Sequence, residues 1–171
     1  MNTAVGSSAE VPSPASGEPE APERATTFEE LFQQRYEPMM RVAFLLVGSR
    51  AEAEDVVQDA FARMNLRWSR IDNPPGYLHR CVVNRSHDVL RRRRVEQRLW
   101  WMHRHETSEL DADEMGDALA ALPPARRTAI VLRYYAGLSE QQIAEAMDVR
   151  PGTVKSLLHR GMAELKRVIE R

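Results

Sequence analysis

The chain has 171 residues, of which 43% are hydrophobic and 29% charged, the values of a soluble globular protein. Its longest unbroken apolar run, Val42 to Val47, is far too short to span a bilayer, and we expect neither membrane insertion nor a signal peptide. The single cysteine, Cys81, excludes internal disulfides and cysteine-based zinc sites, so we expect a cytoplasmic protein without metal or cofactor.

The net charge of −1 hides a strong sorting of charge along the chain. Residues 80–98 contain seven arginines against two acids, and residues 150–171 contain six basic residues against two glutamates. Between them, residues 106–117 contain six acids and no base. This order predicts two contacts with a polyanion and a connector that avoids it, although either basic segment alone could equally be a solvated helix face.

Four prolines among small residues and glutamates predict a disordered tail over residues 1–25. A helical domain is expected over residues 26–96. Thr27 and Glu30 form a capping-box pattern at the start of its first helix, which Pro38 should kink or divide and Gly48 should end.

The next helix has the clearest periodicity in the chain and starts at a second capping-box pattern, Ser49 and Glu52. Its apolar stripe consists of Ala53, Val56, Val57, Ala60, Phe61, Met64 and Trp68. The opposite face is acidic and polar, and without further context ordinary solvent exposure explains it.

A third helix follows the Asn73–Gly76 loop and buries a stripe that includes Leu78, Val82 and Val89. The polar residues that recur on its other side are Arg80, Asn84, His87, Asp88 and Arg91. An asparagine among arginines suits base recognition beside phosphate neutralisation, which predicts a nucleic-acid contact on this helix.

Residues 97–114 are expected to form a flexible acidic linker, helical at most near its start. It carries Trp100 and Trp101, which have no apolar stripe to join. These side chains could mark an interaction surface or could pack on one of the chain's own domains.

Residues 115–171 are expected to form a second helical domain that contains a helix-turn-helix. Ser139 and Gln142 cap a helix of about eight residues, Ile143 and Ala144 point inward, and Val149 fills the turn. The outward residues at the start of the second helix are Thr153, Lys155, Ser156, His159 and Arg160. Side chains at these positions can reach base edges and phosphates in the major groove.

The sequence therefore predicts an all-α protein of two small helical domains joined by a flexible acidic linker, the C-terminal one a helix-turn-helix domain. No segment alternates between apolar and polar residues as a strand would.

These residues together resemble a family. The segments Glu54–Phe61, Trp68–Gly76 and Val83–Arg94 resemble region 2 of extracytoplasmic-function (ECF) sigma factors, and Leu122–Arg127, Leu132–Tyr135 and Gly152–Arg160 resemble their region 4. The resemblance covers about residues 28–170 in the correct order and spacing, and its region 4 part is highly specific.

The resemblance implies a sigma factor that binds RNA polymerase core and directs it to promoters, with an anti-sigma factor as a further expected partner. The residues expected to contact the minus-thirty-five element are Thr153, Lys155, Ser156, His159 and Arg160. Those expected to contact the minus-ten element are Arg80, Asn84, Arg85, His87, Asp88 and Arg91, beside a loop that traps an unpaired base. The residues expected to bind polymerase core, at the β′ clamp helices, are Asp55, Gln58, Asp59 and Phe61, and region 4 is expected to bind the β flap.

One departure from the family concerns Leu157, which stands where relatives often have arginine, so one DNA contact is expected to be missing. The region 2 segment also has few aromatic side chains, with only Trp68 and Tyr77 near the loop. With few platforms on which separated bases can stack, the promoter should have to match closely before it opens.

Two other classes of function compete with a sigma factor. An enzyme is disfavoured because the chain has no phosphate-binding glycine loop, no nucleophile elbow and no HExxH motif. The alternative is a stand-alone helix-turn-helix regulator whose N-terminal domain senses a signal or dimerises. The basic helix with Asn84 favours a two-site promoter binder, because a sensing domain has no need of it.

Overall fold

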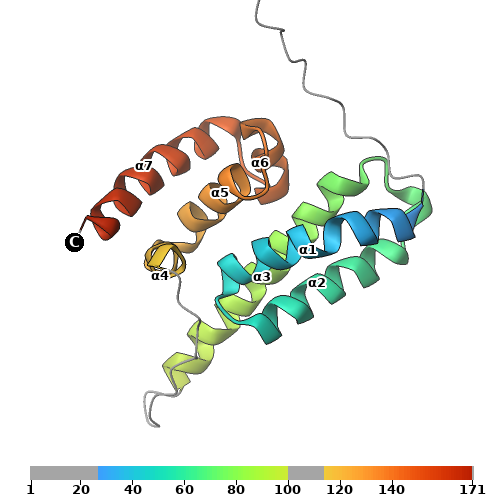
Figure 1. Ribbon diagram of the computed structural model, residues 1–171, viewed down its shortest axis with the longest axis horizontal. Coiled ribbons are helices and arrows are strands. Elements are labelled where there is room, and N and C mark those ends of the chain that lie inside the picture. Colours follow the sequence, from blue (N-terminus) through green and yellow to red (C-terminus); the bar gives the residue numbers. More distant parts are fainter. Residues whose placement is uncertain (1–26, 100–113, 171) are drawn as a thin grey trace, which may run out of the picture.

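The computed structural model describes residues 27–99 and 114–170, which form helices and no strand (Figure 1). The all-α fold is confirmed. The predicted N-terminal tail, most of the predicted linker and the pair Trp100 and Trp101 lie outside the described residues.

The first domain consists of α1 (Phe28–Val47), α2 (Arg50–Asn65), the short 3₁₀ helix η1 (Trp68–Arg70) and α3 (Pro74–Leu99), which pack against one another. The capping box of Thr27 and Glu30 is present, and Gly48 ends α1 with φ of +74°. Pro38 does not divide this helix: it lies on the exposed side, where water can replace the backbone hydrogen bond that proline cannot donate.

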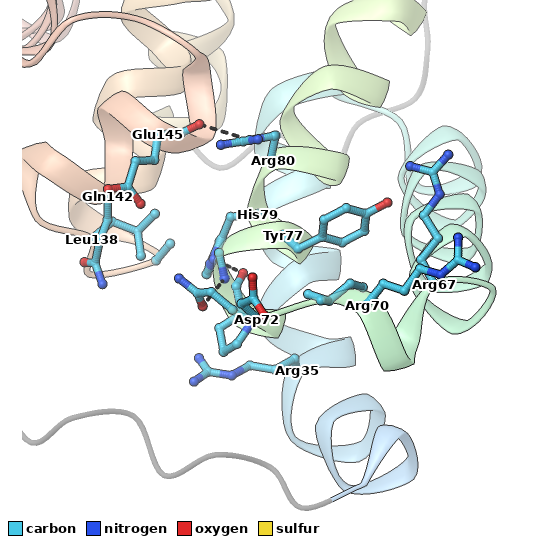
Figure 2. Close-up of a pocket in the computed structure, with 15 residues that line it drawn as sticks. Arg35, Arg67, Arg70, Asp72, Tyr77, His79, Arg80, Leu138, Gln142 and Glu145 are labelled. Carbon is cyan, nitrogen blue, oxygen red and sulfur yellow. Dashed lines mark hydrogen bonds between the residues drawn. The ribbon is translucent and has the colours of Figure 1, made fainter.

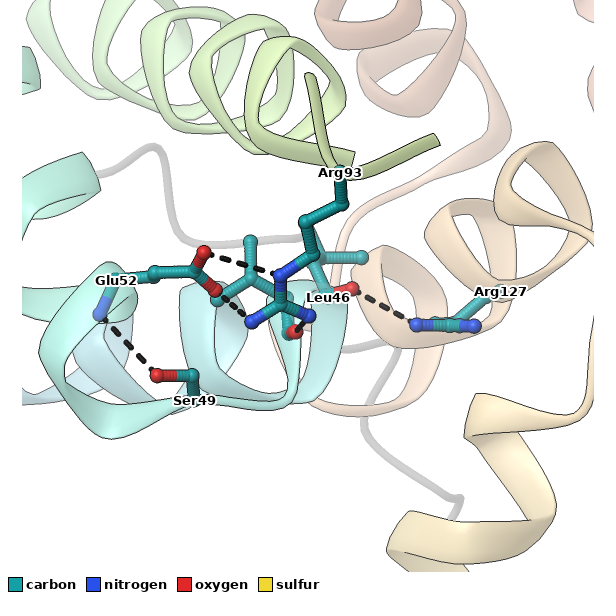
Figure 3. Close-up of polar contacts among 6 residues, drawn as sticks. Leu46, Ser49, Glu52, Arg93 and Arg127 are labelled. Carbon is teal, nitrogen blue, oxygen red and sulfur yellow. Dashed lines mark hydrogen bonds and ion pairs between the residues drawn. The ribbon is translucent and has the colours of Figure 1, made fainter. Parts of the chain in front are cut away.

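The second predicted capping box is only half formed. The Ser49 hydroxyl accepts a hydrogen bond from the Glu52 backbone N–H, but the Glu52 carboxylate does not return to Ser49. It pairs instead with the guanidinium of Arg93 on α3, as Figure 3 shows. A charged partner 41 residues away makes a stronger hydrogen bond than the neutral backbone N–H would.

The aromatic end of the first domain lies where α1 and α2 meet η1. Phe61 is 3% exposed, and its ring lies 4.8 Å from that of Phe32 and 6.1 Å from that of Phe28. Phe28 in turn meets Trp68 edge to face at 5.5 Å. These ring contacts place Phe61 in the hydrophobic core of the domain.

The second domain consists of α4 (Glu114–Ala120), α5 (Pro124–Tyr134), α6 (Glu140–Met147) and α7 (Pro151–Ile169). The capping box of Ser139 and Gln142 starts α6, and Asp148 turns the chain into α7 with φ of +54°. Helices α6 and α7 pack on α5, so the predicted helix-turn-helix is confirmed.

The two domains pack directly against each other, which no sequence pattern indicated. Helix α3 lies against α6, and α1 lies against α4 and α5 (Figure 1). The core residues of both domains form one continuous buried cluster.

Candidate promoter and polymerase interfaces

The N-terminal half of α7 presents the predicted major-groove residues to solvent. Val154 is fully buried, and Leu158 and Leu165 also pack on the core, so this stripe fixes the rotation of the helix. The exposed residues are the ones that the sequence predicted, namely Thr153, Lys155, Ser156, His159 and Arg160. Leu157 is half-buried beside them. An exposed helix of this kind can enter the major groove without a change in its own fold.

A buried glycine allows α7 to cross α5 closely. A Cβ atom at Gly161 would lie 2.9 Å from Cδ1 of Ile130 and 3.3 Å from Cβ of Arg126. The close crossing, together with the Arg126–Glu164 ion pair, holds the recognition helix against its supporting helix.

The predicted minus-ten residues on α3 fall into three groups. Asn84 is exposed. Arg80 and His87 instead contact the second domain: Nε of Arg80 donates to the Glu145 carbonyl at 3.2 Å, and Nε2 of His87 lies 2.9 Å from Oγ1 of Thr128. Two of the predicted DNA contacts therefore also contact the chain's own second domain, although Arg80 stays exposed.

The direction of the His87 hydrogen bond follows from its surroundings. The Thr128 hydroxyl donates to the Pro124 carbonyl at 2.9 Å, so its oxygen accepts from His87, whose Nε2 must carry a proton. Burial lowers the pKa of His87, with the charge of Asp88 opposing this shift. Burial thus favours the neutral ring, and the contact with Thr128 places its proton on Nε2.

The other predicted minus-ten residues make ion pairs within the first domain. Arg91 pairs with Asp88 at 2.5 Å on the exposed side of α3. Nε of Arg85 lies 3.4 Å from a carboxylate oxygen of Asp59 on α2, which ties the two helices together. Arg85 therefore faces α2 rather than the free side of α3.

The acidic-polar face of α2 remains largely open. Asp55 and Gln58 are exposed, whereas Asp59 is half-buried and pairs with Arg63 at 2.9 Å as well as with Arg85. Phe61, which was predicted to contact polymerase, is buried in the aromatic core, and a buried ring cannot meet a partner surface. Of the four predicted residues, Asp55 and Gln58 are thus the ones best placed to contact a partner protein.

Two arginines converge on the C-terminal end of α1, as Figure 3 shows. Arg93 of α3 donates to the Val47 carbonyl at 2.7 Å, and Arg127 of α5 donates to the Leu46 carbonyl at 2.9 Å. The last carbonyls of a helix lack partners within it and carry partial negative charge, so cations are favourable there. No local pattern in the sequence predicts this role for Arg127, because Leu46 lies 81 residues away in the chain.

A cleft of about 690 Å³ lies between the domains, beside the loop that precedes α3 (Figure 2). Its first wall includes Arg35, Asp72 and Tyr77, and its second wall includes Leu138 and Gln142 of the helix-turn-helix domain. His79 lies beneath it, 6% exposed, and burial lowers its pKa while Nδ1 donates to the Pro75 carbonyl at 2.8 Å.

Within the described ranges, no group of three or more histidine, cysteine or acidic side chains could hold a metal ion. None of the described helices is long and apolar enough to cross a membrane. What the structure offers is a recognition helix and a basic helix on two joined helical domains. This arrangement defines a two-domain helical DNA-binding protein.

Comparison with known proteins identifies the family. The model of sigma-70 region 2 matches residues 31–96, and that of sigma-70 region 4 matches residues 112–165. The RNA polymerase sigma-E factor of Streptomyces coelicolor is 33% identical over 148 residues, which cover 81% of this chain and 84% of that protein. The ECF RNA polymerase sigma factor SigE of Mycolicibacterium smegmatis is 33% identical over 82% of this chain and 60% of that protein.

Solved structures agree in fold. The sigma factor RpoE of Bartonella quintana, crystallised with the anti-sigma factor NepR, superposes with a TM-score of 0.73 at 22% identity over 84% of this chain and 96% of that one. CnrH, in complex with the cytosolic domain of CnrY, gives a TM-score of 0.64 at 20% identity, covering 84% of this chain and 87% of that one.

The chain belongs to the ECF sigma factors of RNA polymerase. It is an initiation factor and not an enzyme, and it directs RNA polymerase to specific promoters.

Proposed function

We propose that α7 recognises the minus-thirty-five element and that α3, with the loop before it, recognises the minus-ten element. The observation that carries the first assignment is that the five outward residues of α7 are exposed beside a fully buried Val154. The second rests on exposed Asn84 within a basic helix that adjoins the interdomain cleft. An asparagine can bond both edges of an adenine, and the arginines around it neutralise phosphates.

The face of α2 with Asp55 and Gln58 is proposed to bind the β′ clamp helices of polymerase core, and the second domain to bind the β flap. Asp55 and Gln58 are exposed while the opposite stripe of α2 is buried, so the face can accept a partner without unfolding. The proposed place of action is the cytoplasm, where polymerase and the chromosome are found.

An anti-sigma factor is proposed as a further partner. The structures of RpoE and CnrH are each complexes with another protein, which for RpoE is an anti-sigma factor. Copurification with a tagged form of this chain, before and after stress, would identify such a partner. Recovery of polymerase subunits alone under every condition would argue against it.

Transcription in vitro by core polymerase, with and without this chain, tests the promoter assignments. Lys155→Ala and Arg160→Ala should each weaken the binding free energy for the upstream element by about 1–3 kcal/mol if the contact is to a base. Arg167→Ala is the matched control, since it is also exposed on α7 but lies two turns beyond Arg160. Equal loss from all three variants would show that only overall charge matters.

Asn84→Ala should change base preference within the downstream element and leave the upstream element untouched. If this variant transcribed every downstream sequence as the wild type does, Asn84 would have no role in recognition.

Core binding is tested by the double substitution Asp55→Arg with Gln58→Ala. It should lower affinity for polymerase core while the circular dichroism spectrum stays unchanged, because both residues are exposed. Glu37→Arg, a charge reversal on the exposed side of α1, is the control. Core affinity that responds equally to both charge reversals would reject a specific site on α2.

A further inference from the structure

The cleft between the two domains is basic, although its walls come from distant parts of the chain. The arginines that line it are Arg35 of α1, Arg67 and Arg70 of the segment after α2, and Arg80 of α3. The carboxylates among its lining residues are those of Asp72 and Glu145. The cleft therefore carries more positive than negative charge, and it attracts anions.

No carboxylate neutralises these four arginines. The ion pairs among the described residues join other side chains, and none of them includes an arginine of the cleft. Elsewhere on the first domain, Arg63, Arg85 and Arg93 each have an acidic partner. The arginines of the cleft thus keep their charge available for a ligand.

Arg35 differs most from the other arginines. Its Nε is buried and has no hydrogen-bond partner among the described residues. The Nε atoms of Arg85 and Arg127 share this property, but the Arg85 guanidinium pairs with Asp59, and that of Arg127 donates to three carbonyls. Arg35 makes no comparable contact, and Figure 2 shows its guanidinium extending from α1 toward the side of the cleft that the second domain forms. A buried N–H without an acceptor is costly, and such groups in native proteins usually have a role.

The rest of the lining suits the uncharged part of a ligand. Leu138 of the second domain is an apolar wall, and the ring of Tyr77 lies on the opposite side (Figure 2). Asp72 is an acceptor, and Gln142 keeps its NH₂ group as a donor because its side-chain oxygen accepts the Ser139 backbone N–H. The volume of about 690 Å³ lies within the range of about 300–1,000 Å³ that small-molecule sites have. A planar ring with polar edges, joined to phosphates, matches these features.

We infer that the cleft binds a free nucleotide, whose phosphates pair with Arg35 and the other arginines of the cleft and whose base lies against Leu138. This site goes beyond the promoter contacts, because Arg35 and Leu138 belong to neither proposed recognition element. The ligand contacts both domains, so it stabilises their packing by an amount that rises with its concentration. The free chain thereby responds to the supply of nucleotide.

Arg35→Gln is the first test. It removes the charge, keeps a polar side chain, and breaks no hydrogen bond or ion pair with the described residues. Losing one hydrogen bond between charged groups should weaken nucleotide binding about tenfold. Arg41→Gln is the matched control, since Arg41 is exposed on the same helix and does not line the cleft.

Gln142→Glu tests the wall of the second domain. Glutamate serves as well as glutamine in the capping box at the start of α6, so the helix should keep its fold. The new carboxylate repels phosphate within the cleft, and affinity for the nucleotide should fall about tenfold. Gln141→Glu makes the same change one residue earlier, outside the cleft, and should bind as the wild type does.

Isothermal titration calorimetry of the full chain without polymerase measures binding of ATP and of GTP. Pyrophosphate and adenosine are titrated in parallel, as the phosphate part and the ring part alone. A short single-stranded oligonucleotide is a further probe, because a DNA strand carries the same chemistry. We expect at least one of the two nucleotides to bind more tightly than pyrophosphate, adenosine and the oligonucleotide. Amide resonances of Asn73 and Leu138, which lie on opposite walls, should both shift as that nucleotide is added.

Absence of binding at millimolar ATP and GTP would overturn the inference. Binding that Arg35→Gln and Gln142→Glu leave unchanged would overturn it too, because the nucleotide would then lie elsewhere. Pyrophosphate as tight as the nucleotides would reduce the cleft to an anion site without a place for the base. Tighter binding of the oligonucleotide, lost in Arg35→Gln, would assign the cleft to the promoter strand in place of a free nucleotide.

Discussion

Replacing Arg127 by methionine tests how much one tertiary contact stabilises this chain. Arg127 is 9% exposed, and its guanidinium donates to the carbonyls of Leu46, Ala120 and Leu122 at 2.9, 2.6 and 3.3 Å. Methionine keeps most of the side-chain volume and removes all three bonds. Each hydrogen bond to a charged group contributes about 1.5–3 kcal/mol, but water can reach part of this site after the change. The change leaves three carbonyls without this donor but leaves no buried charge, and we expect a total loss of about 3–5 kcal/mol.

The neighbouring Arg126 provides the matched control. It pairs with Glu164 on α7, and both side chains are about a third exposed, at 31% and 35%. A pair of this kind stabilises by roughly 0–1 kcal/mol, so Arg126→Met should be nearly neutral. Urea unfolding followed by circular dichroism measures both variants, with an unchanged m-value as the sign that the unfolded state is the same. Equal losses in the two variants would refute the assignment of the larger effect to buried carbonyl contacts.

Three further outcomes follow from local geometry. Gly161→Ala should destabilise by about 1–2 kcal/mol because its Cβ would press on Ile130 at 2.9 Å, whereas Gly152→Ala, with open space around it, should be neutral or stabilising in thermal melts. Asp148→Gly should raise stability by up to about 1 kcal/mol, since glycine adopts a φ of +54° without steric cost, and a lower melting temperature would contradict this. The lowered pKa of buried His79 means that the folded chain binds a proton less readily than the unfolded chain. The contribution of neutral His79 to the free energy of unfolding is therefore complete above the ordinary pKa of about 6.5 and is lost as the pH falls below it. The unfolding free energy measured from pH 7.5 to 5.5 should decrease less in His79→Asn than in the wild type.

The basic residues of α3 also stabilise the fold of the chain itself. The basic helix α3 donates to backbone carbonyls of both domains. Arg80 donates to the Glu145 carbonyl of the second domain, and Arg93 donates to the Val47 carbonyl of the first. An N–H that donates to a carbonyl in this way cannot donate to a phosphate at the same time.

The sequence determined the features that depend on neighbours along the chain. Capping at Thr27 and Ser139 and the left-handed end of α1 at Gly48 each need only a few consecutive residues, and the structure contains them as predicted. The exposed face of α7 was predictable as well, because helical periodicity places Val154 and Leu158 on one stripe and Lys155 and His159 outside it.

Tertiary structure alone decided which side chains contact other parts of the chain and which face solvent. A capping-box pattern at Ser49 and Glu52 could not show that Arg93 would bind the Glu52 carboxylate more strongly than the backbone does. A motif that contains Phe61 could not show that three aromatic rings would enclose it. The contact of His87 with Thr128 likewise joins residues 41 positions apart. Side chains on one helix face look alike in a sequence, and only the packing of distant helices determines which of them meets protein and which meets solvent.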